Sequence, residues 1–140
     1  RADNKSMLVL LDDAGKIASY ADVPDIALDL IEVADKPTTI IYLGAKRLAP
    51  NLIAEDGTIG IRITREEFTR SLIFRYNKPI VSTSANISGE PSPHFFGEIS
   101  EEIKNAVDYI VDYRRNDHKP AAPSSIIKLG MGGEIQIIRK

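Results

Sequence analysis

Apolar residues along the chain recur with two different periods, and together they predict a mixture of strands and helices. In the stretch 59–63, isoleucines alternate with Gly60 and Arg62, which is the period of a half-buried strand with Arg62 on the opposite face. Short runs of consecutive apolar or β-branched residues predict further strands. We expect strands at 7–11, 39–43, 59–63, 79–82, 109–111, 125–129 and 134–138, the last two joined by a glycine-rich hairpin turn at 130–133.

Other segments carry the spacing of amphipathic helices. The first, 24–34, has a proline and an aspartate at its start, where the helix dipole favours negative charge. The second follows Thr64 and Glu67, which fit a capping box, and extends to about residue 75. The third begins after Ser100, a plausible cap, and runs to 107. Because strands and helices mix without strict alternation, we expect an α/β fold of the α+β type with a mixed sheet.

Length and composition are those of one soluble globular domain. The chain has 140 residues, of which 43% are hydrophobic and 27% charged, so it can bury a core. We therefore expect a single domain over 1–140. The polar stretch 82–93 predicts a long loop, and 114–122 predicts a mobile loop rather than a domain boundary.

Composition also disfavours several classes of function. A net charge of −2 provides no global basic field that would steer the chain onto nucleic acid. The absence of cysteine excludes disulfides, thiolate metal sites and cysteine nucleophiles. No apolar run approaches the roughly 20 residues that span a bilayer, so we expect no membrane partner, no signal peptide and a cytoplasmic location. Phosphate-loop and dinucleotide-binding glycine motifs are absent, so any nucleotide must bind in another way.

The clearest candidate for chemistry is the segment 82–89, which follows an apolar strand and contains Ser82, Ser84 and Asn86. Its hydroxyls, amide and flexible glycine can offer many short hydrogen bonds to an anion, a phosphate or a small zwitterion. A turn whose polar side chains satisfy their own backbone would have the same composition. The residues alone favour the turn.

Other charged residues give weaker signals. An arginine in an apolar strand, such as Arg62, faces either solvent or a polar cleft, and the pattern does not decide between them. Arg139 fits an exposed terminus better. The densest basic stretch, 114–119, could contact phosphates, but the interleaved Asp117 weakens that interpretation. Both histidines lack acidic or cysteine neighbours at metal-binding spacing, so we expect no metal held by protein side chains.

A long stretch of the chain resembles the hallmark of the YrdC-like threonylcarbamoyl-AMP synthase family. That stretch is 78–91, Lys-Pro-Ile-Val-Ser-Thr-Ser-Ala-Asn-Ile-Ser-Gly-Glu-Pro. Further segments match family motifs in the same order. They are Arg1 with 7–11 (the arginine of Lys-x-Arg and the following strand), 58–63 (Thr-Val-Gly-Val-Arg), 123–127 (Pro-Ser-Thr-Ile-Val) and 137–140 (Ile-Ile-Arg). The resemblance covers nearly the whole chain.

The chain departs from the family pattern at three places. The stretch 34–39 keeps only Pro37 and Thr39 of a tryptophan-proline-glycine-proline stretch and its threonine. Ser125 stands where the family usually has threonine. In the family, a segment before Arg1 supplies a further threonine, more strands and a lysine. We therefore expect this chain to be N-terminally truncated, with an active site that lacks that contribution.

The resemblance implies a twisted mixed sheet flanked by helices, with an open concave ligand cleft. It also implies that L-threonine, bicarbonate and ATP, with Mg²⁺, give threonylcarbamoyl-AMP and pyrophosphate without a side-chain nucleophile. The product would supply a downstream transferase complex that makes the t6A modification of tRNA. By family analogy, ATP and its phosphates bind Arg1, Thr39, Ser82, Ser84, Asn86 and Arg139, whereas threonine or its carbamate binds Arg62, Ser84 and Ser124.

Three other interpretations keep the fold and change the function. YrdC-like domains have also been regarded as modules that bind double-stranded RNA or tRNA without catalysis, although the acidic balance of this chain argues against strong autonomous binding. A degenerate paralogue is the second. A related domain serves in the carbamoyltransferase that matures hydrogenases, but the zinc-finger and acylphosphatase regions of that protein are not in this sequence.

Overall fold

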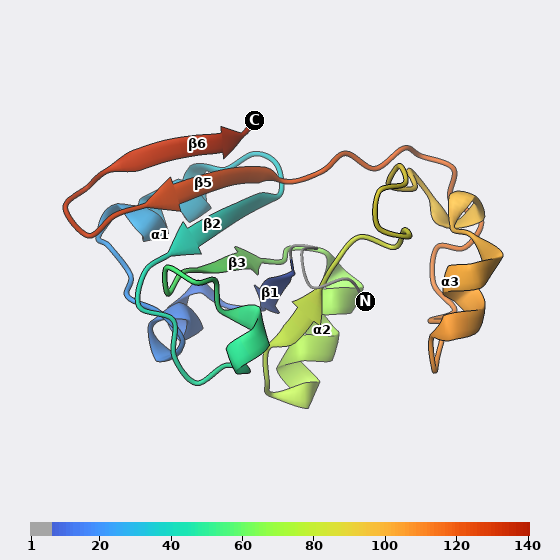
Figure 1. The fold of residues 1–140 in the computed structure, drawn as a ribbon, viewed down its shortest axis with the longest axis horizontal. Coiled ribbons are helices and arrows are strands. Elements are labelled where there is room, and N and C mark those ends of the chain that lie inside the picture. The colour runs from blue at the N-terminus through green and yellow to red at the C-terminus, as the bar shows by residue number, and fades with distance from the viewer. Residues whose placement is uncertain (1–6) are drawn as a thin grey trace. The chain divides into compact units, whose positions relative to one another are not determined.

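The computed structural model describes residues 7–140, so Arg1 lies outside the described residues. These residues form two compact units. The larger unit contains 7–82 and 124–140 and holds the whole β-sheet, whereas the smaller unit contains 83–123 and one short α-helix (Figure 1). The C-terminal strands therefore return to the sheet after the smaller unit, which brings residues that are far apart in the sequence onto neighbouring strands.

The larger unit is built on a six-stranded sheet in the order β4-β1-β3-β2-β5-β6 (Figure 1). β1 runs parallel to β3 and β2 runs parallel to β5, while the other neighbours are antiparallel. The predicted mixed sheet with flanking helices is thus confirmed. The strands are β1 (Leu8–Leu11), β2 (Thr38–Tyr42), β3 (Ile59–Ile63), β4 (Ile80–Ser82), β5 (Ser125–Leu129) and β6 (Ile135–Arg139).

One face of this sheet carries the hydrophobic core. Helix α1 (Ile26–Val33) and the 3₁₀ helix η1 (Ala14–Ser19) contribute Ala27 and Ile17, which are both fully buried. Burying an isoleucine side chain such as that of Ile17 stabilises the fold by roughly 1.5–3 kcal/mol. The other buried core residues are Val9, Leu11, Ala21, Ile40, Tyr42, Ile59, Ile61 and Leu129.

Helix α2 (Glu67–Tyr76) begins with a cap that differs from the predicted one. Glu66 is the N-cap, and its carboxylate accepts hydrogen bonds from the amides of Phe68 and Thr69 at 3.1 and 2.7 Å. The predicted cap, Thr64, instead accepts a hydrogen bond from the amide of Glu66 at 3.3 Å. A carboxylate reaches two otherwise unpaired amides and places negative charge at the positive end of the helix, which a hydroxyl cannot do.

Arg65 joins the end of α1 to the start of α2. Its Nη1 donates to the carbonyl oxygen of Ala34 at 2.7 Å, and its Nη2 donates to that of Ile31. The last carbonyls of a helix have no partner within the helix, so the guanidinium group supplies the missing donors. The contact fixes α1 against the connection between β3 and α2.

The smaller unit contains η3 (Phe96–Glu98) and α3 (Glu101–Ala106). The prediction that Ser100 caps α3 is confirmed, because its hydroxyl accepts a hydrogen bond from the amide of Ile103 at 3.3 Å. In neither unit, within residues 7–140, is any helix both long and apolar enough to cross a bilayer.

The strand predicted at 109–111 is wrong, since this segment has no regular secondary structure. The guanidinium group of Arg115 donates to the carbonyl oxygens of Ile110 and Val111 at 2.7 and 3.1 Å. The side chain of Arg115 therefore binds the carbonyl oxygens that would accept hydrogen bonds from a neighbouring strand. Apolar residues predicted the strand, and a nearby arginine prevented it.

Two arginines of the basic stretch 114–119 lie beside acidic side chains. Arg114 donates to the carboxylate of Asp117 at 2.6 Å, and Arg115 lies 3.6 Å from a carboxylate oxygen of Asp112. A phosphate backbone would have to compete with these carboxylates for the two arginine side chains. The contacts agree with the expectation that Asp117 weakens this stretch as a nucleic-acid contact.

Candidate functional site

Strands β2 and β3 bring Thr39 and Arg62 together on the sheet face opposite the core. The two residues are register partners in an antiparallel pair, so their side chains leave the sheet on the same side. Thr39 is only 3% exposed although it is polar. A buried hydroxyl requires a hydrogen-bond partner, and here the partner comes from the far end of the sequence.

Ser124 is that partner. Its hydroxyl oxygen lies 2.9 Å from the hydroxyl oxygen of Thr39, and Ser124 itself is 5% exposed. Ser124 directly precedes β5, and the parallel pairing of β5 with β2 places Ser125 opposite Thr38. The strand register therefore holds two hydroxyls in contact that are 85 residues apart in the sequence.

Arg139 reaches the same face because of a β-bulge in β6. Ile127 pairs with Ile137 but Ile126 pairs with Arg139, so β6 holds one extra residue at this point. In an unbroken ladder Arg139 would lie on the side of Ile137, because residues two apart share a face. The extra residue turns it to the opposite side, where its Nε donates to the carbonyl oxygen of Ser124 at 2.8 Å.

Two guanidinium groups dominate the charge of this face. Burial lowers the pKa of Arg62 below its usual value, and the nearby positive charge of Arg139 lowers it further. Arg62 stays protonated all the same, because an arginine side chain loses its proton only far above physiological pH. Within residues 7–140, neither arginine forms an ion pair with an acidic side chain. A partly buried arginine and an exposed one, neither paired with an acid among the described residues, favour an anionic ligand.

These four residues, Thr39, Arg62, Ser124 and Arg139, are called the Thr39 cluster below. It offers two hydroxyls and two guanidinium groups, which match carboxylate and phosphate oxygens. Within the described part of the chain, no three histidine, cysteine or acidic side chains lie close enough to hold a metal ion. The donor set of the cluster therefore suits an oxyanion better than a metal ion.

Gly60 keeps the sheet surface beside Thr39 open. A Cβ atom at this position would lie 3.4 Å from Cγ2 of Thr39 and 3.7 Å from Cβ of Leu8. Any larger side chain would cover the surface next to the cluster. This role of Gly60 was not predicted, although the alternation of residues along β3 indicates that Gly60 and Arg62 share a face.

The predicted residues of the 82–89 segment are divided between the two units. Ser82 is the register partner of Leu8 and so lies on the Thr39 side of the sheet, at its β4 edge. Ser84 and Asn86 belong to the smaller unit. The side-chain Nδ2 of Asn86 donates to the carbonyl oxygen of Ile87 at 3.1 Å and to that of Glu90 at 2.8 Å. These bonds stabilise a turn, and the ligand contacts of Ser84, Asn86 and the undescribed Arg1 stay predictions.

Comparison with known proteins places these features in a family. The family model for Sua5, YciO and YrdC proteins, described as telomere recombination, matches residues 1–140. A Methanocaldococcus jannaschii protein provisionally named threonylcarbamoyl-AMP synthase is 39% identical over 130 residues, which cover 92% of this chain and 59% of that protein. A Pseudoalteromonas translucida protein named threonylcarbamoyl-AMP synthase is 26% identical over 139 residues, which cover 96% of this chain and 73% of that protein. The chain thus spans only part of the length of these relatives.

Solved structures show the same fold. E. coli YciO has a TM-score of 0.80 at 21% identity, covering 99% of this chain and 67% of YciO. P. abyssi Sua5, in a complex with L-threonine, has a TM-score of 0.77 at 21% identity, covering 92% of this chain and 38% of Sua5. At these identities the structures establish the fold alone, and the family follows from the match to the family model over the whole sequence. The chain belongs to the Sua5, YciO and YrdC family.

Proposed function

We propose that this chain carries the site of a threonylcarbamoyl-AMP synthase, which makes threonylcarbamoyl-AMP and pyrophosphate from L-threonine, bicarbonate and ATP. The observation that carries the proposal is the Thr39 cluster, in which two guanidinium groups and two hydroxyls lie on one sheet face without an acidic partner among the described residues. The substrates carry carboxylate and phosphate oxygens that fit these donors. The names of the sequence relatives and the threonine complex of P. abyssi Sua5 support the same conclusion.

The four residues have separate roles in this proposal. Arg62 and Ser124 bind threonine or its carbamate, because a guanidinium fork matches the two oxygens of a carboxylate. Thr39 and Arg139 bind the phosphates of ATP. Ser124 also holds the side chains of Thr39 and Arg139 in position. Its hydroxyl contacts Thr39, and its carbonyl oxygen accepts a hydrogen bond from Arg139. By resemblance, the phosphate site also includes Arg1, Ser82, Ser84 and Asn86.

The proposed reaction needs positioning more than covalent help from the protein. The amino group of threonine adds to bicarbonate, and loss of water leaves a carbamate. A carbamate oxygen then attacks the α-phosphorus of ATP, and the bond from that phosphorus to the bridging oxygen breaks, releasing pyrophosphate. Positive charge at Arg139 offsets the negative charge that grows on the leaving group. A site that holds both reactants in line lowers the barrier further.

Magnesium enters this proposal as part of the nucleotide substrate. The Thr39 cluster provides no carboxylate, which is the protein ligand that Mg²⁺ prefers. We therefore expect the ion to be held by phosphate oxygens and water, with ATP binding as its magnesium complex. The product, a mixed anhydride of threonylcarbamate and AMP, would pass its threonylcarbamoyl group to tRNA in the t6A modification.

The test is threonine-dependent release of pyrophosphate, combined with NMR titration of the chain with L-threonine. We expect Arg62→Ala to weaken threonine binding and Arg139→Ala and Asn86→Ala to reduce pyrophosphate release, each by about tenfold or more, because each loses a hydrogen bond to a charged group. Arg70→Ala, an exposed arginine on α2, is the matched control and should change neither measurement. Unchanged threonine binding in Arg62→Ala together with unchanged release in Asn86→Ala would contradict the site assignment.

A further inference from the structure

Among the strands of residues 7–140, only β3 contains a glycine, Gly60, and nothing in the local structure requires one there. Gly60 does not have a positive φ, so a residue with a side chain could adopt its backbone conformation. Its nearest neighbours, Thr39 and Leu8, would meet an added Cβ at 3.4 and 3.7 Å, which are ordinary contact distances. An alanine would therefore fit at this position among the described residues.

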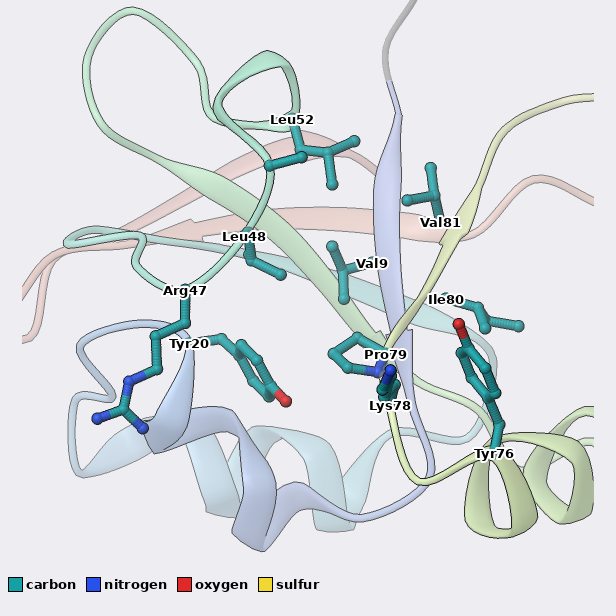
Figure 2. Close-up of a pocket in the computed structure, with 11 residues that line it drawn as sticks. Val9, Tyr20, Arg47, Leu48, Leu52, Tyr76, Lys78, Pro79, Ile80 and Val81 are labelled. Atoms are coloured by element: carbon teal, nitrogen blue, oxygen red, sulfur yellow. The ribbon is translucent and has the colours of Figure 1, made fainter.

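Glycine inside a strand is unfavourable unless something approaches the backbone closely. It has no side chain to pack and it loses more conformational freedom on folding than any other residue. The pocket of about 340 Å³ that Val9 lines does not account for it (Figure 2). Val9 is the register partner of Ile61, so this pocket lies on the side opposite to Gly60 and Arg62. On the side of the Thr39 cluster, a bound ligand would explain the glycine.

The recess above Gly60 has apolar walls. Thr39 places its hydroxyl oxygen 2.9 Å from that of Ser124, so its methyl carbon Cγ2 is the atom that faces Gly60. The opposite wall is Cβ of Leu8, on β1. A single added carbon already contacts both walls, so the recess has room for one methyl-sized group. A planar ring would lie across the opening instead of entering it.

Arg62 determines which part of a ligand reaches this recess. Gly60 and Arg62 share a face of β3 and lie two residues apart, which is about 6.5 Å along a strand. In the proposed function Arg62 binds the carboxylate of threonine, whose Cβ carries one methyl group and one hydroxyl. Carbon walls favour the methyl group, because a hydroxyl placed there would have no hydrogen-bond partner.

We propose that Gly60 is a specificity-determining residue and that the recess above it holds the β-methyl group of the amino-acid substrate. The inference rests on the proposed function, since Arg62 has to hold the carboxylate. It adds a reason for selectivity within that function. Serine lacks the methyl group and leaves the recess empty, so the site favours threonine over serine.

The first measurement locates the methyl group in the unaltered chain. L-threonine that is isotope-labelled at its methyl group is bound to the chain and studied by isotope-filtered NMR. We expect nuclear Overhauser effects from this methyl group to the Hα protons of Gly60 and to the methyl group of Thr39. Bound threonine without these effects would overturn the inference. So would effects from the adenine protons of ATP to Gly60, because the base would then occupy the recess.

The second measurement compares the affinities of three amino acids. The unaltered chain should bind L-threonine about fourfold more tightly than L-serine, which is the effect of burying one methyl group. Gly60→Ala should weaken L-threonine and L-2-aminobutyrate, which both carry the methyl group, by about tenfold through overpacking. Serine binding should hardly change, and the Tm should not fall. Gly15→Ala is the matched control, because its added Cβ would also meet only an ordinary contact, 3.5 Å from Oδ1 of Asp13.

Arg62→Ala separates this inference from the proposed function. Threonine binding that is absent, or that is unchanged in Arg62→Ala, would contradict the proposed site and this inference together. The inference alone would be overturned if Arg62→Ala abolished threonine binding while Gly60→Ala weakened threonine and serine by the same factor, or weakened neither. Loss of all three amino acids only in the alanine variant of Gly60 would indicate general damage to the site rather than selection of a methyl group.

Discussion

The two faces of the sheet use neighbouring residues of the same strands for opposite purposes. On β3, Ile61 is 1% exposed in the core, whereas Arg62 next to it belongs to the Thr39 cluster. On β2, Ile40 lies in the core and Thr39 in the cluster. One face excludes water by packing, and the other holds polar groups by hydrogen bonds. Substitutions on the first face should therefore change the free energy of unfolding, whereas substitutions on the second should mainly change ligand binding.

The largest effect on stability is expected in the core. Ile61→Ala removes a side chain that is 1% exposed and leaves a cavity, so the free energy of unfolding should fall by about 3 kcal/mol. Ile137→Ala is the matched control, because this isoleucine of β6 is 61% exposed and its loss should cost under about 1 kcal/mol. Urea denaturation measures both. Equal losses in the two variants would show that the core side of the sheet is not the main source of stability.

A smaller stability effect and a larger binding effect are expected at the Thr39 cluster. Thr39→Val and Ser124→Ala each leave a buried hydroxyl without its partner and should cost about 1–2 kcal/mol. The double variant should cost about 1 kcal/mol less than the sum, since the shared hydrogen bond is lost only once. Both single variants should weaken L-threonine binding, whereas Ile61→Ala should leave it unchanged while folded. Strictly additive costs would show that the two hydroxyls do not interact.

The strands that contribute to the hydrophobic core could be predicted, because alternation and apolar runs are local signals in the sequence. The core strands were placed within one or two residues, and the family resemblance pointed to Thr39, Arg62, Ser124 and Arg139. The direction of Arg139 could not be predicted, because it depends on a bulge that exists only once β5 and β6 have paired. The hydrogen bond between Thr39 and Ser124 likewise depends on the order of the strands, which periodicity does not give.

The wrong predictions share one physical cause, which is competition by a nearby charged side chain. Glu66 took the place of Thr64 at the start of α2 because its carboxylate reaches two amides. Arg115 took the carbonyl oxygens that a strand at 109–111 would have used. Patterns of apolar residues predict which segments are buried. They do not predict which charged side chain will bind the backbone beside them.

The hydroxyl group of Tyr42, which is buried in the hydrophobic core, gives a third prediction. Tyr42 is 1% exposed, its hydroxyl has no hydrogen-bond partner among the described residues, and burial raises its pKa well above the usual value. Removing a buried hydroxyl that lacks a partner costs little, so Tyr42→Phe should leave stability unchanged or raise it by up to about 1 kcal/mol. Thermal unfolding measures the difference. A loss above about 1 kcal/mol would mean that the hydroxyl is bonded in solution.

The smallest expected effect concerns Asp56, whose carboxylate lies 3.2 Å from Lys128 on the Thr39 side of the sheet. Hydrogen bonds from Thr58, and then Lys128, lower the pKa of Asp56 from 3.8 to about 2. Folding therefore favours the ionised carboxylate, so its contribution is present above pH 3.8 and is lost as the pH falls toward 2. Asp56→Asn should slightly lower the Tm at pH 6, and the difference from the unaltered chain should shrink as the pH falls through 2 and vanish below it. Carboxyl NMR titration gives the sharper measurement, because Thr58→Ala should raise the pKa of Asp56 more than Lys128→Met does. The reverse order would show that the ion pair, rather than the hydroxyl of Thr58, holds this carboxylate in its charged form.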